Sequence, residues 1–220
     1  MSYQDNLRQV NDAITHYKTV PNVTLIGVTK TLSLEETETA IQAGIHNLGE
    51  NRLQSAEIKI QKLNKKYDLN WHFIGNIQSK KLKKIVELFD VIQSVGSIEH
   101  LSLINKYCVD FGKRMKVLFQ VNISKEESKH GFSKDELEST SINFDDYPNI
   151  DFLGYMTMAP YTGTDKELIS IFKGLRTLAE DLKQTNGINY TELSMGMSND
   201  YKYALQEGAT IIRLGTILFS

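Results

Sequence analysis

The stretch VTLIGVTK, residues 23–30, is an apolar run that ends on a lysine. Runs of this length and composition are typical of a strand buried on both faces of a parallel sheet. Side chains alternate between the two faces of a strand, so Lys30 shares a face with Val28 and Ile26, whereas Gly27 lies on the other face. If Lys30 points to the axis of a barrel, Gly27 faces the surrounding helices and permits their close approach.

Lys30 is the candidate reactive group of the chain. At the rim of a closed pocket its amine would leave water, and desolvation disfavours the ammonium form. We therefore expect the pKa of Lys30 to fall, which would make the free amine available for Schiff-base chemistry. A lysine at the end of a strand also reaches solvent easily, so this segment alone does not distinguish the two interpretations. The distinction comes from the far end of the chain.

Short apolar runs alternate with amphipathic stretches from one end of the chain to the other. The expected strands are residues 23–29, 46–50, 71–75, 90–95, 116–123, 151–157, 190–195 and 210–215. The expected helices are residues 3–18, 33–43, 51–66, 78–89, 97–112, 133–142, 165–185 and 198–207. Eight strands in strict alternation with helices predict an α/β protein with a closed (β/α)₈ TIM barrel, and a doubly wound open sheet is the alternative. No Pro/Gly-rich linker interrupts the pattern, so residues 1–220 are expected to form one domain.

The overall composition is that of an ordinary soluble globular protein, with 40% apolar and 24% charged residues. The net charge of −2 provides no general attraction to nucleic acid or to an anionic membrane. The basic run at residues 79–84 overlaps apolar residues at helical spacing, so its lysines are interpreted as a solvated helix face. No apolar run approaches membrane-spanning length, and the polar N-terminus does not resemble a signal peptide. The cytoplasm is the expected compartment.

The other reactive residue types indicate no separate site. Cys108, the single cysteine, falls on an apolar helical stripe and is interpreted as a core residue. The five histidines are scattered, and no His/Cys/Asp/Glu cluster has the spacing of metal ligands, so no metal is expected. The charged loop 124–131 is interpreted as a surface loop, with a gate over a pocket or a partner contact as alternatives.

A second group of candidate residues follows the seventh expected strand. The segment Ser194-Met195-Gly196-Met197-Ser198 leads into a helix that Ser198 is expected to cap, and Gly196 allows backbone N–H groups to approach an anion. The eighth strand ends in Arg213-Leu214-Gly215-Thr216, a second turn of small residues. In a barrel the ends of strands 7 and 8 commonly form a phosphate site, and strand 1 lies beside them. A strand-1 amine next to such a site fits an aldehyde that carries a phosphate.

Short segments in order along nearly the whole chain carry a resemblance to a known family. They are Gly27-Val28-Thr29-Lys30, Gly49-Glu50-Asn51, Trp71-His72-Phe73-Ile74-Gly75, Gln78-Ser79-Lys80, Gln120-Val121-Asn122-Ile123-Ser124, Gly154-Tyr155-Met156-Thr157-Met158, Leu193-Ser194-Met195-Gly196-Met197-Ser198 and Arg213-Leu214-Gly215-Thr216. In these segments the chain resembles the pyridoxal phosphate homeostasis protein family, relatives of the barrel domain of bacterial alanine racemase.

The resemblance implies that Lys30 forms a Schiff base with pyridoxal 5′-phosphate. It also implies that Arg213 faces the pyridine nitrogen and that Asn51 and His72 line the ring, although His72 inside an apolar strand is equally well explained as a hydrogen-bonded core residue. The remaining cofactor-binding residues that it implies are Ser194, Gly196, Ser198, Gly215 and Thr216.

The function that this resemblance implies is a carrier or buffer of the cofactor in vitamin B6 and amino-acid homeostasis. Arg213 stays charged and so disfavours protonation of the pyridine nitrogen, which makes the cofactor a weaker electron sink. Racemisation would also need a second acid/base group, which in the alanine racemases comes from a partner subunit's β-domain, and no such domain is expected here. Tyr155, Tyr161 and Tyr201 are interpreted as packing or surface residues, so no catalytic residue is assigned.

Two enzyme functions are the alternatives. One is a pyridoxal-phosphate-dependent amino-acid racemase with low activity, and the other is a Schiff-base aldolase that acts on a phosphorylated substrate without a cofactor. The expected partners of a carrier are pyridoxal phosphate and the apo forms of pyridoxal phosphate enzymes, with the chain itself as a monomer.

Overall fold

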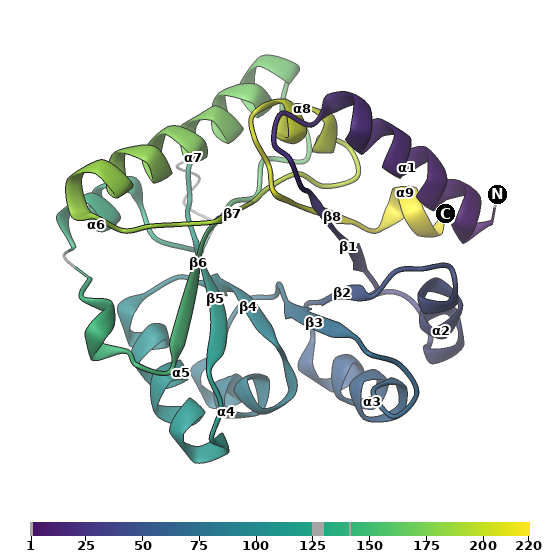
Figure 1. The fold of residues 1–220 in the computed structure, drawn as a ribbon, viewed down its shortest axis with the longest axis horizontal. Coiled ribbons are helices and arrows are strands. Elements are labelled where there is room, and N and C mark those ends of the chain that lie inside the picture. The colour runs from purple at the N-terminus through teal and green to yellow at the C-terminus, as the bar shows by residue number, and fades with distance from the viewer. Residues whose placement is uncertain (1, 125–129, 141) are drawn as a thin grey trace.

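Parallel strands close into a barrel in a computed structural model that describes residues 2–124, 130–140 and 142–220 (Figure 1). Within the described residues the strand order is β1 to β8 around the barrel, with helices between successive strands. The strands are β1 (Thr24–Val28), β2 (Asn47–Glu50), β3 (Asn70–Phe73), β4 (Val91–Val95), β5 (Met115–Gln120), β6 (Ile150–Met156), β7 (Glu192–Ser194) and β8 (Ile211–Leu214). The predicted barrel is therefore confirmed, and the open sheet is excluded.

The helices form the outer layer of the barrel (Figure 1). They are α1 (Tyr3–Tyr17), α2 (Leu34–Gln42), α3 (Leu53–Leu63), α4 (Ser79–Leu88), α5 (Ile98–Phe111), α6 (Lys134–Ser139), α7 (Asp165–Asn186), α8 (Tyr201–Gln206) and α9 (Thr216–Phe219), with a 3₁₀ turn at Phe144–Asp146. The predicted charged loop 124–131 falls mostly on residues 125–129, which lie outside the described residues. Among the described residues, no helix combines the length and apolar character needed to cross a membrane.

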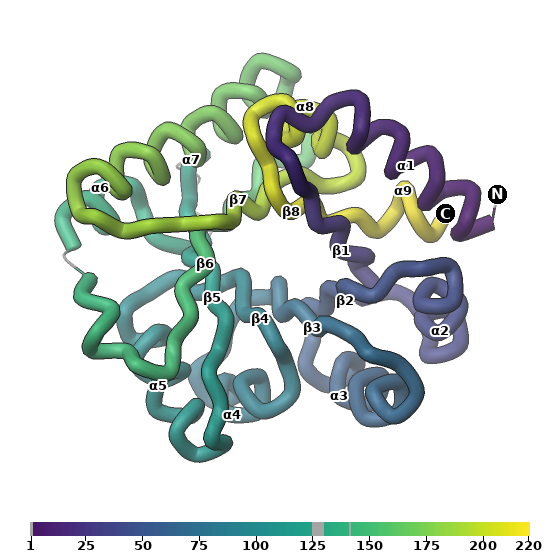
Figure 2. Tube along the Cα trace, viewed as in Figure 1, coloured from purple at the N-terminus to yellow at the C-terminus, as the bar shows by residue number. Residues whose placement is uncertain are grey.

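The barrel closes by pairing its first strand with its last. Ile26 on β1 lies opposite Arg213 on β8, and the register continues to Gly27 and Leu214. The two chain ends also meet on the outside, where the Asn6 side chain of α1 donates to the Leu218 carbonyl of α9 over 3.0 Å (Figure 2). Closure therefore brings Lys30, which follows β1, beside the residues that follow β8.

The alternation of β1 is as expected from its sequence. Ile26 belongs to the apolar cluster inside the barrel, together with Ile211 of β8. Gly27 faces outward, where a Cβ atom would lie only 2.6 Å from the Ile45 side chain. A side chain at this position would overlap the outer layer, so Gly27 permits the close approach that was predicted.

Helix boundaries account for most differences from the expected elements. The helix expected at 198–207 begins only at Tyr201, with Asp200 at its N-cap position. Ser198 is therefore not its cap, and that prediction is wrong. Residues 197–200 instead form a turn in which the Tyr201 N–H donates to the Met197 carbonyl over 2.9 Å. The short helix α9 was not expected, because four residues carry no recognisable helical period.

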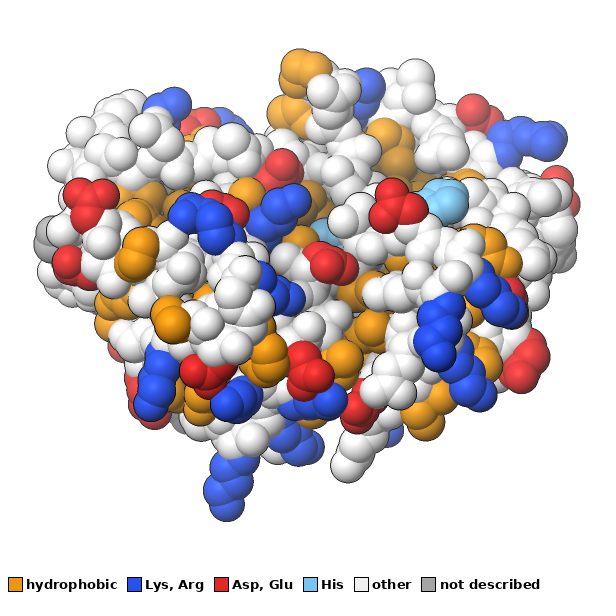
Figure 3. Space-filling model, turned by 60° about the horizontal axis from the view of Figure 1, so that its bottom comes forward, with side chains coloured by type: hydrophobic (Ala, Val, Ile, Leu, Met, Phe, Trp, Pro, Cys, Tyr) orange, Lys and Arg blue, Asp and Glu red, His pale blue; other side chains and the backbone are white. Residues whose placement is uncertain are grey.

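The basic run at residues 79–84 lies on the outer face of α4. Leu82 and Ile85 are buried, whereas Lys83 pairs with Asp110 on α5 over 2.7 Å. On the face shown in Figure 3, basic side chains are interspersed with acidic ones. These lysines thus form a solvated and partly neutralised helix face, as the spacing predicted.

Candidate functional site

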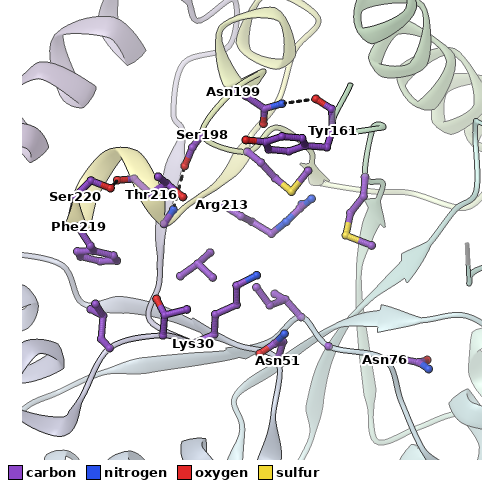
Figure 4. Close-up of a pocket in the computed structure, with 18 residues that line it drawn as sticks. Lys30, Asn51, Asn76, Tyr161, Ser198, Asn199, Arg213, Thr216, Phe219 and Ser220 are labelled. Atoms are coloured by element: carbon purple, nitrogen blue, oxygen red, sulfur yellow. Dashed lines mark hydrogen bonds between the residues drawn. The ribbon is translucent and has the colours of Figure 1, made fainter. Parts of the chain in front are cut away.

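A cavity of about 580 Å³ opens at the carboxyl ends of the strands. Figure 4 shows Lys30 and Arg213 extending into it from the ends of β1 and β8. Its wall combines residues from segments far apart in the chain: Val28, Lys30, Thr31, Leu32, Asn51, Ile74, Gly75, Asn76, Met158, Tyr161, Met197, Ser198, Asn199, Arg213, Gly215, Thr216, Phe219 and Ser220. The expected juxtaposition of the strand-1 lysine with the turns after β7 and β8 is present.

Lys30 lines this cavity but is not buried. The side chain is exposed, and the residue lies in the turn after β1, where the Leu32 N–H donates to the Thr29 carbonyl over 3.0 Å. The expectation that the amine leaves water is therefore wrong for this structure, because the turn lifts Lys30 beyond the last buried layer of the barrel. The cavity is open at this end, and a ligand can reach the amine from solvent.

A buried ion pair supports the turn that carries Lys30. Lys59 of α3 and Glu50 of β2 lie 2.8 Å apart, with side chains that are 5% and 0% exposed. The Thr29 hydroxyl donates to the same Glu50 oxygen over 2.7 Å, and the Lys59 ammonium donates to the Thr29 carbonyl over 2.7 Å. The backbone immediately before Lys30 is therefore fixed by charged groups. The sequence pattern did not identify this pair, although a glutamate at the end of an expected strand was a signal for it.

Polar groups from the turns after β7 and β8 meet beside the end of β1, where Gly215 lies against Val28. The Ser198 hydroxyl oxygen accepts hydrogen bonds from the backbone N–H groups of Gly215 and Ile217, each over 3.3 Å. Ser198, Gly215 and Thr216 all line the cavity. Backbone N–H groups and a hydroxyl that converge in this way are suitable donors for the oxygens of a phosphate group.

Gly196 and Asp200 shape this side of the site from behind. Gly196 has φ +96°, and a Cβ atom there would lie 2.7 Å from Ala204 of α8. Gly196 thus allows α8 to pack against the turn, and it is not among the residues that line the cavity. The Asp200 carboxylate accepts from the Met197 N–H rather than facing the cavity, and burial raises the pKa of Asp200.

Arg213 lies deeper than Lys30. The residue is 3% exposed, and its guanidinium donates to the Ser194 hydroxyl over 2.6 Å and to the Thr157 carbonyl over 2.8 Å. Burial lowers the pKa of Arg213 to about 10, so the group remains charged at neutral pH. It places a fixed, positively charged hydrogen-bond donor at the floor of the cavity.

The structure separates the other predicted site residues into two groups. Asn51 lines the cavity, and its Oδ1 atom is buried without a hydrogen-bond partner among the described residues. Ser194 and His72 are buried within the barrel and do not line the cavity. His72 Nδ1 lies 3.0 Å from Gln93 Nε2, and burial with the nearby Lys116 ammonium lowers the pKa of His72 to about 4. His72 is thus the hydrogen-bonded core residue of the two interpretations.

The three candidate tyrosines differ in their access to the cavity. Tyr155 and Tyr201 are buried, and burial raises the pKa of both phenols. Tyr161 alone of the three lines the cavity, and it is 82% exposed at the mouth. Its carbonyl accepts from the Asn199 side chain over 3.2 Å (Figure 4). Tyr155 and Tyr201 are packing residues, as predicted.

Several cavity residues were not singled out from the sequence. They lie in the turns after the strands, at positions that only barrel closure brings to the mouth, and they are Asn76, Met158, Met197 and Asn199. The one indication of them in the sequence was that each lies shortly after the end of an expected strand. Among the described residues, no group of three or more His, Cys, Asp or Glu side chains is arranged to hold a metal ion.

The fold is a closed (β/α)₈ barrel, and one cavity in it contains a strand-1 lysine, a buried arginine and a cradle of N–H groups. These features define a ligand-binding barrel of the alanine racemase type. The family model for the alanine racemase N-terminal domain matches residues 2–220. The pyridoxal phosphate homeostasis protein of Synechocystis is 38% identical over 90% of this chain and 91% of its own length. That of Aquifex aeolicus is 35% identical over 89% and 85% of the two chains.

Solved structures agree with this assignment. PipY of Synechococcus elongatus with PLP bound superposes with a TM-score of 0.90 at 33% identity, covering 100% of both chains. Alanine racemase of Clostridium difficile shares the fold, with a TM-score of 0.75 at 15% identity over 97% of this chain and 56% of that one. The chain belongs to the pyridoxal phosphate homeostasis protein family.

Proposed function

We propose that this chain binds pyridoxal 5′-phosphate through Lys30 and acts as a carrier or buffer of the cofactor. The observation that carries the proposal is the cavity that contains an accessible amine, a phosphate-type cradle and a charged arginine. The relatives named pyridoxal phosphate homeostasis protein, and PipY with PLP bound, support the choice of ligand. When bound, this group supplies an aldehyde that condenses with an amine to form a Schiff base.

The residues around the cavity suit this ligand. Lys30 is exposed to the cavity and can present its amine to an aldehyde carbon. Ser198 and the N–H groups at the start of α9 offer the donors that a phosphate needs. Arg213 is a charged donor and therefore suits an unprotonated ring nitrogen, which accepts a hydrogen bond. The aldehyde, the phosphate and the ring nitrogen of the cofactor thus each have a matching group in one cavity.

The same geometry favours a carrier over a racemase. Arg213 disfavours protonation of the ring nitrogen and so weakens the stabilisation of a substrate carbanion. The buried phenols of Tyr155 and Tyr201 have no access to the cavity, and Tyr161 is solvent-exposed at the mouth. A binding role needs only the groups that are present, whereas racemisation needs a proton donor held on the second face of the ring.

Reduction with borohydride tests the attachment directly. Purified protein is incubated with pyridoxal phosphate, and the expected result is absorption of visible light that a Lys30→Ala variant lacks. Lys80→Ala is the matched control, because Lys80 is an exposed lysine outside the cavity. After reduction and proteolysis, mass spectrometry is expected to find a pyridoxyl group on Lys30. An adduct on another lysine alone contradicts attachment through Lys30, and a colourless protein contradicts cofactor binding and would favour the aldolase alternative.

A transfer assay tests the carrier role separately. The loaded chain is mixed with an apoenzyme that requires pyridoxal phosphate, and the recovery of that enzyme's activity is followed with time. Recovery is expected while the visible absorption of the loaded chain falls. The chain alone is assayed for racemisation of amino acids, and a turnover typical of enzymes, above about 1 s⁻¹, would contradict the carrier role.

A further inference from the structure

Four buried polar side chains cross the interior of the barrel beneath the cavity. Arg213 of β8 donates to the Ser194 hydroxyl of β7 over 2.6 Å, and that hydroxyl donates to Gln93 Oε1 of β4 over 2.7 Å. Gln93 Nε2 lies 3.0 Å from His72 Nδ1 of β3. The four residues are between 0% and 5% exposed. They connect the floor of the cavity with the opposite wall of the barrel.

Arg213 and the orientation of the Gln93 amide together set the directions of the hydrogen bonds in this network. A guanidinium only donates, so Ser194 accepts from Arg213, and the Ser194 hydrogen points to the Gln93 Oε1 atom that faces it. The Gln93 carbonyl oxygen then faces Ser194, which leaves its NH₂ group to donate to His72. His72 Nδ1 is therefore the acceptor, and the ring is neutral with its hydrogen on Nε2.

This network holds Arg213 in a single orientation. One terminal nitrogen is bound to Ser194 and the other to the Thr157 carbonyl, which leaves the remaining N–H groups for the cavity. The surrounding interior is apolar, with Ile26 and Ile211 in contact at the same barrel wall. Four polar residues inside an apolar barrel cost stability unless they satisfy one another, so their presence at this place needs an explanation other than packing.

We propose that Ser194, Gln93 and His72 are positioning residues that fix the orientation of Arg213 toward the ring nitrogen of the bound cofactor. This inference rests on the proposed function and adds three residues to it, none of which reaches the cavity. Ser194 and His72 thus act on the cofactor through Arg213 rather than by touching it. The predicted consequence is that changing them alters how the ring is bound, while the attachment through Lys30 persists.

The Ser194→Ala variant removes the hydroxyl that Arg213 binds. Hydrogen bonds to charged groups are strong enough that its loss is expected to weaken the affinity for pyridoxal phosphate about tenfold and to shift the visible absorption maximum of the bound cofactor. Ser194→Thr keeps a hydroxyl and is expected to restore both. Gln93→Leu breaks the network one step further from Arg213 and is expected to shift the absorption in the same direction. Far-UV circular dichroism verifies that each variant is folded.

Ser94 offers a matched control on the same strand as Gln93. It is buried, and its hydroxyl has no hydrogen-bond partner among the described residues. Ser94→Ala removes an equivalent atom without touching the network, so affinity within about twofold of the wild type is expected. If Ser194→Ala and Gln93→Leu bind the cofactor with the affinity and spectrum of Ser94→Ala, the inference is overturned. A wild-type chain that takes up no cofactor removes the proposed function as well, and the two failures are thereby distinguished.

Nitrogen NMR of the cofactor-free chain, with labelled histidine, tests the same network independently of binding. His72 is expected to show an unprotonated Nδ1 and a protonated Nε2 at pH 7. In the Gln93→Leu variant, which lacks the donor to Nδ1, a change of tautomer population is expected. A His72 tautomer population in Gln93→Leu equal to that of the wild type would show that Gln93 does not bind His72 and would contradict the inference.

Discussion

The Lys59→Met substitution would remove the cation that supports the turn before Lys30. Lys59 is paired with Glu50 over 2.8 Å and also donates to the Thr29 carbonyl. Methionine has a similar length but no charge, so it fills the space and leaves Glu50 buried without a counter-ion. The Thr29 hydroxyl still donates to Glu50, but the Thr29 carbonyl loses its donor.

The size of the effect follows from the burial of the pair. With side chains 5% and 0% exposed, the Glu50 charge cannot be solvated when its partner is removed. Breaking a buried pair on one side costs about 3–5 kcal/mol. A domain of this kind has a total free energy of unfolding of about 5–15 kcal/mol, so a large fraction of the stability would be lost. The double variant Lys59→Met/Glu50→Gln removes the orphaned charge and keeps an acceptor for Thr29, so most of the loss should be recovered.

Urea unfolding followed by circular dichroism measures these differences. The matched control is Lys84→Met, whose partners Glu57 and Glu87 each lie 3.0 Å away on the surface, where the three side chains are 34–42% exposed. Exposed pairs contribute about 0–1 kcal/mol, so this variant should be almost as stable as the wild type. If Lys59→Met costs no more than Lys84→Met, or if the double variant is no more stable than Lys59→Met, the assignment of a stabilising buried pair is refuted.

Three further predictions concern the barrel itself. The pKa of His72 is lowered from 6.5 to about 4 in the folded chain, so as the pH falls the unfolded chain protonates His72 before the folded chain does. The contribution of His72 to the free energy of unfolding is therefore fully present above pH 6.5 and is lost as the pH falls toward 4. Urea unfolding should show that the free energy of unfolding falls between pH 7 and pH 5 by about 2 kcal/mol less in His72→Gln than in the wild type. An equal fall in the two proteins would contradict the lowered pKa. Gly154→Ala places a Cβ atom 2.0 Å from the Glu192 carbonyl oxygen, at a residue with φ +149°. It should lower the free energy of unfolding by about 3 kcal/mol or more in the same assay. Gly112→Ala is the control, because its Cβ atom meets no atom within 4 Å, and it should cost about 1 kcal/mol. Thr164→Ala removes the N-cap of α7 and should lower the free energy of unfolding by about 1 kcal/mol, and an unchanged midpoint would show that the capping box is dispensable.

The order of strands and helices is determined by local periodicity. The run that precedes Lys30 is a short continuous apolar segment, and the stripe on α7 repeats with the helical period, so both could be identified without knowledge of their neighbours. Eight such alternations leave few topologies, and in a closed barrel the first strand must adjoin the last. This is why Lys30 and the Gly215–Thr216 turn could be expected at one mouth.

The depth and partners of the site residues depend on packing between distant segments. Ser194 and Gln93 are 101 positions apart, and no local pattern pairs them. Hydrogen bonds across the barrel depend on how eight strands tilt and pair, which each strand's own sequence does not specify. The same holds for the solvent access of Lys30, which depends on how far its turn rises above the barrel. The sequence alone thus determined that Lys30 and the turns after the last two strands lie at one end of the barrel, whereas tertiary structure decided which of their residues line the cavity and which are buried behind it.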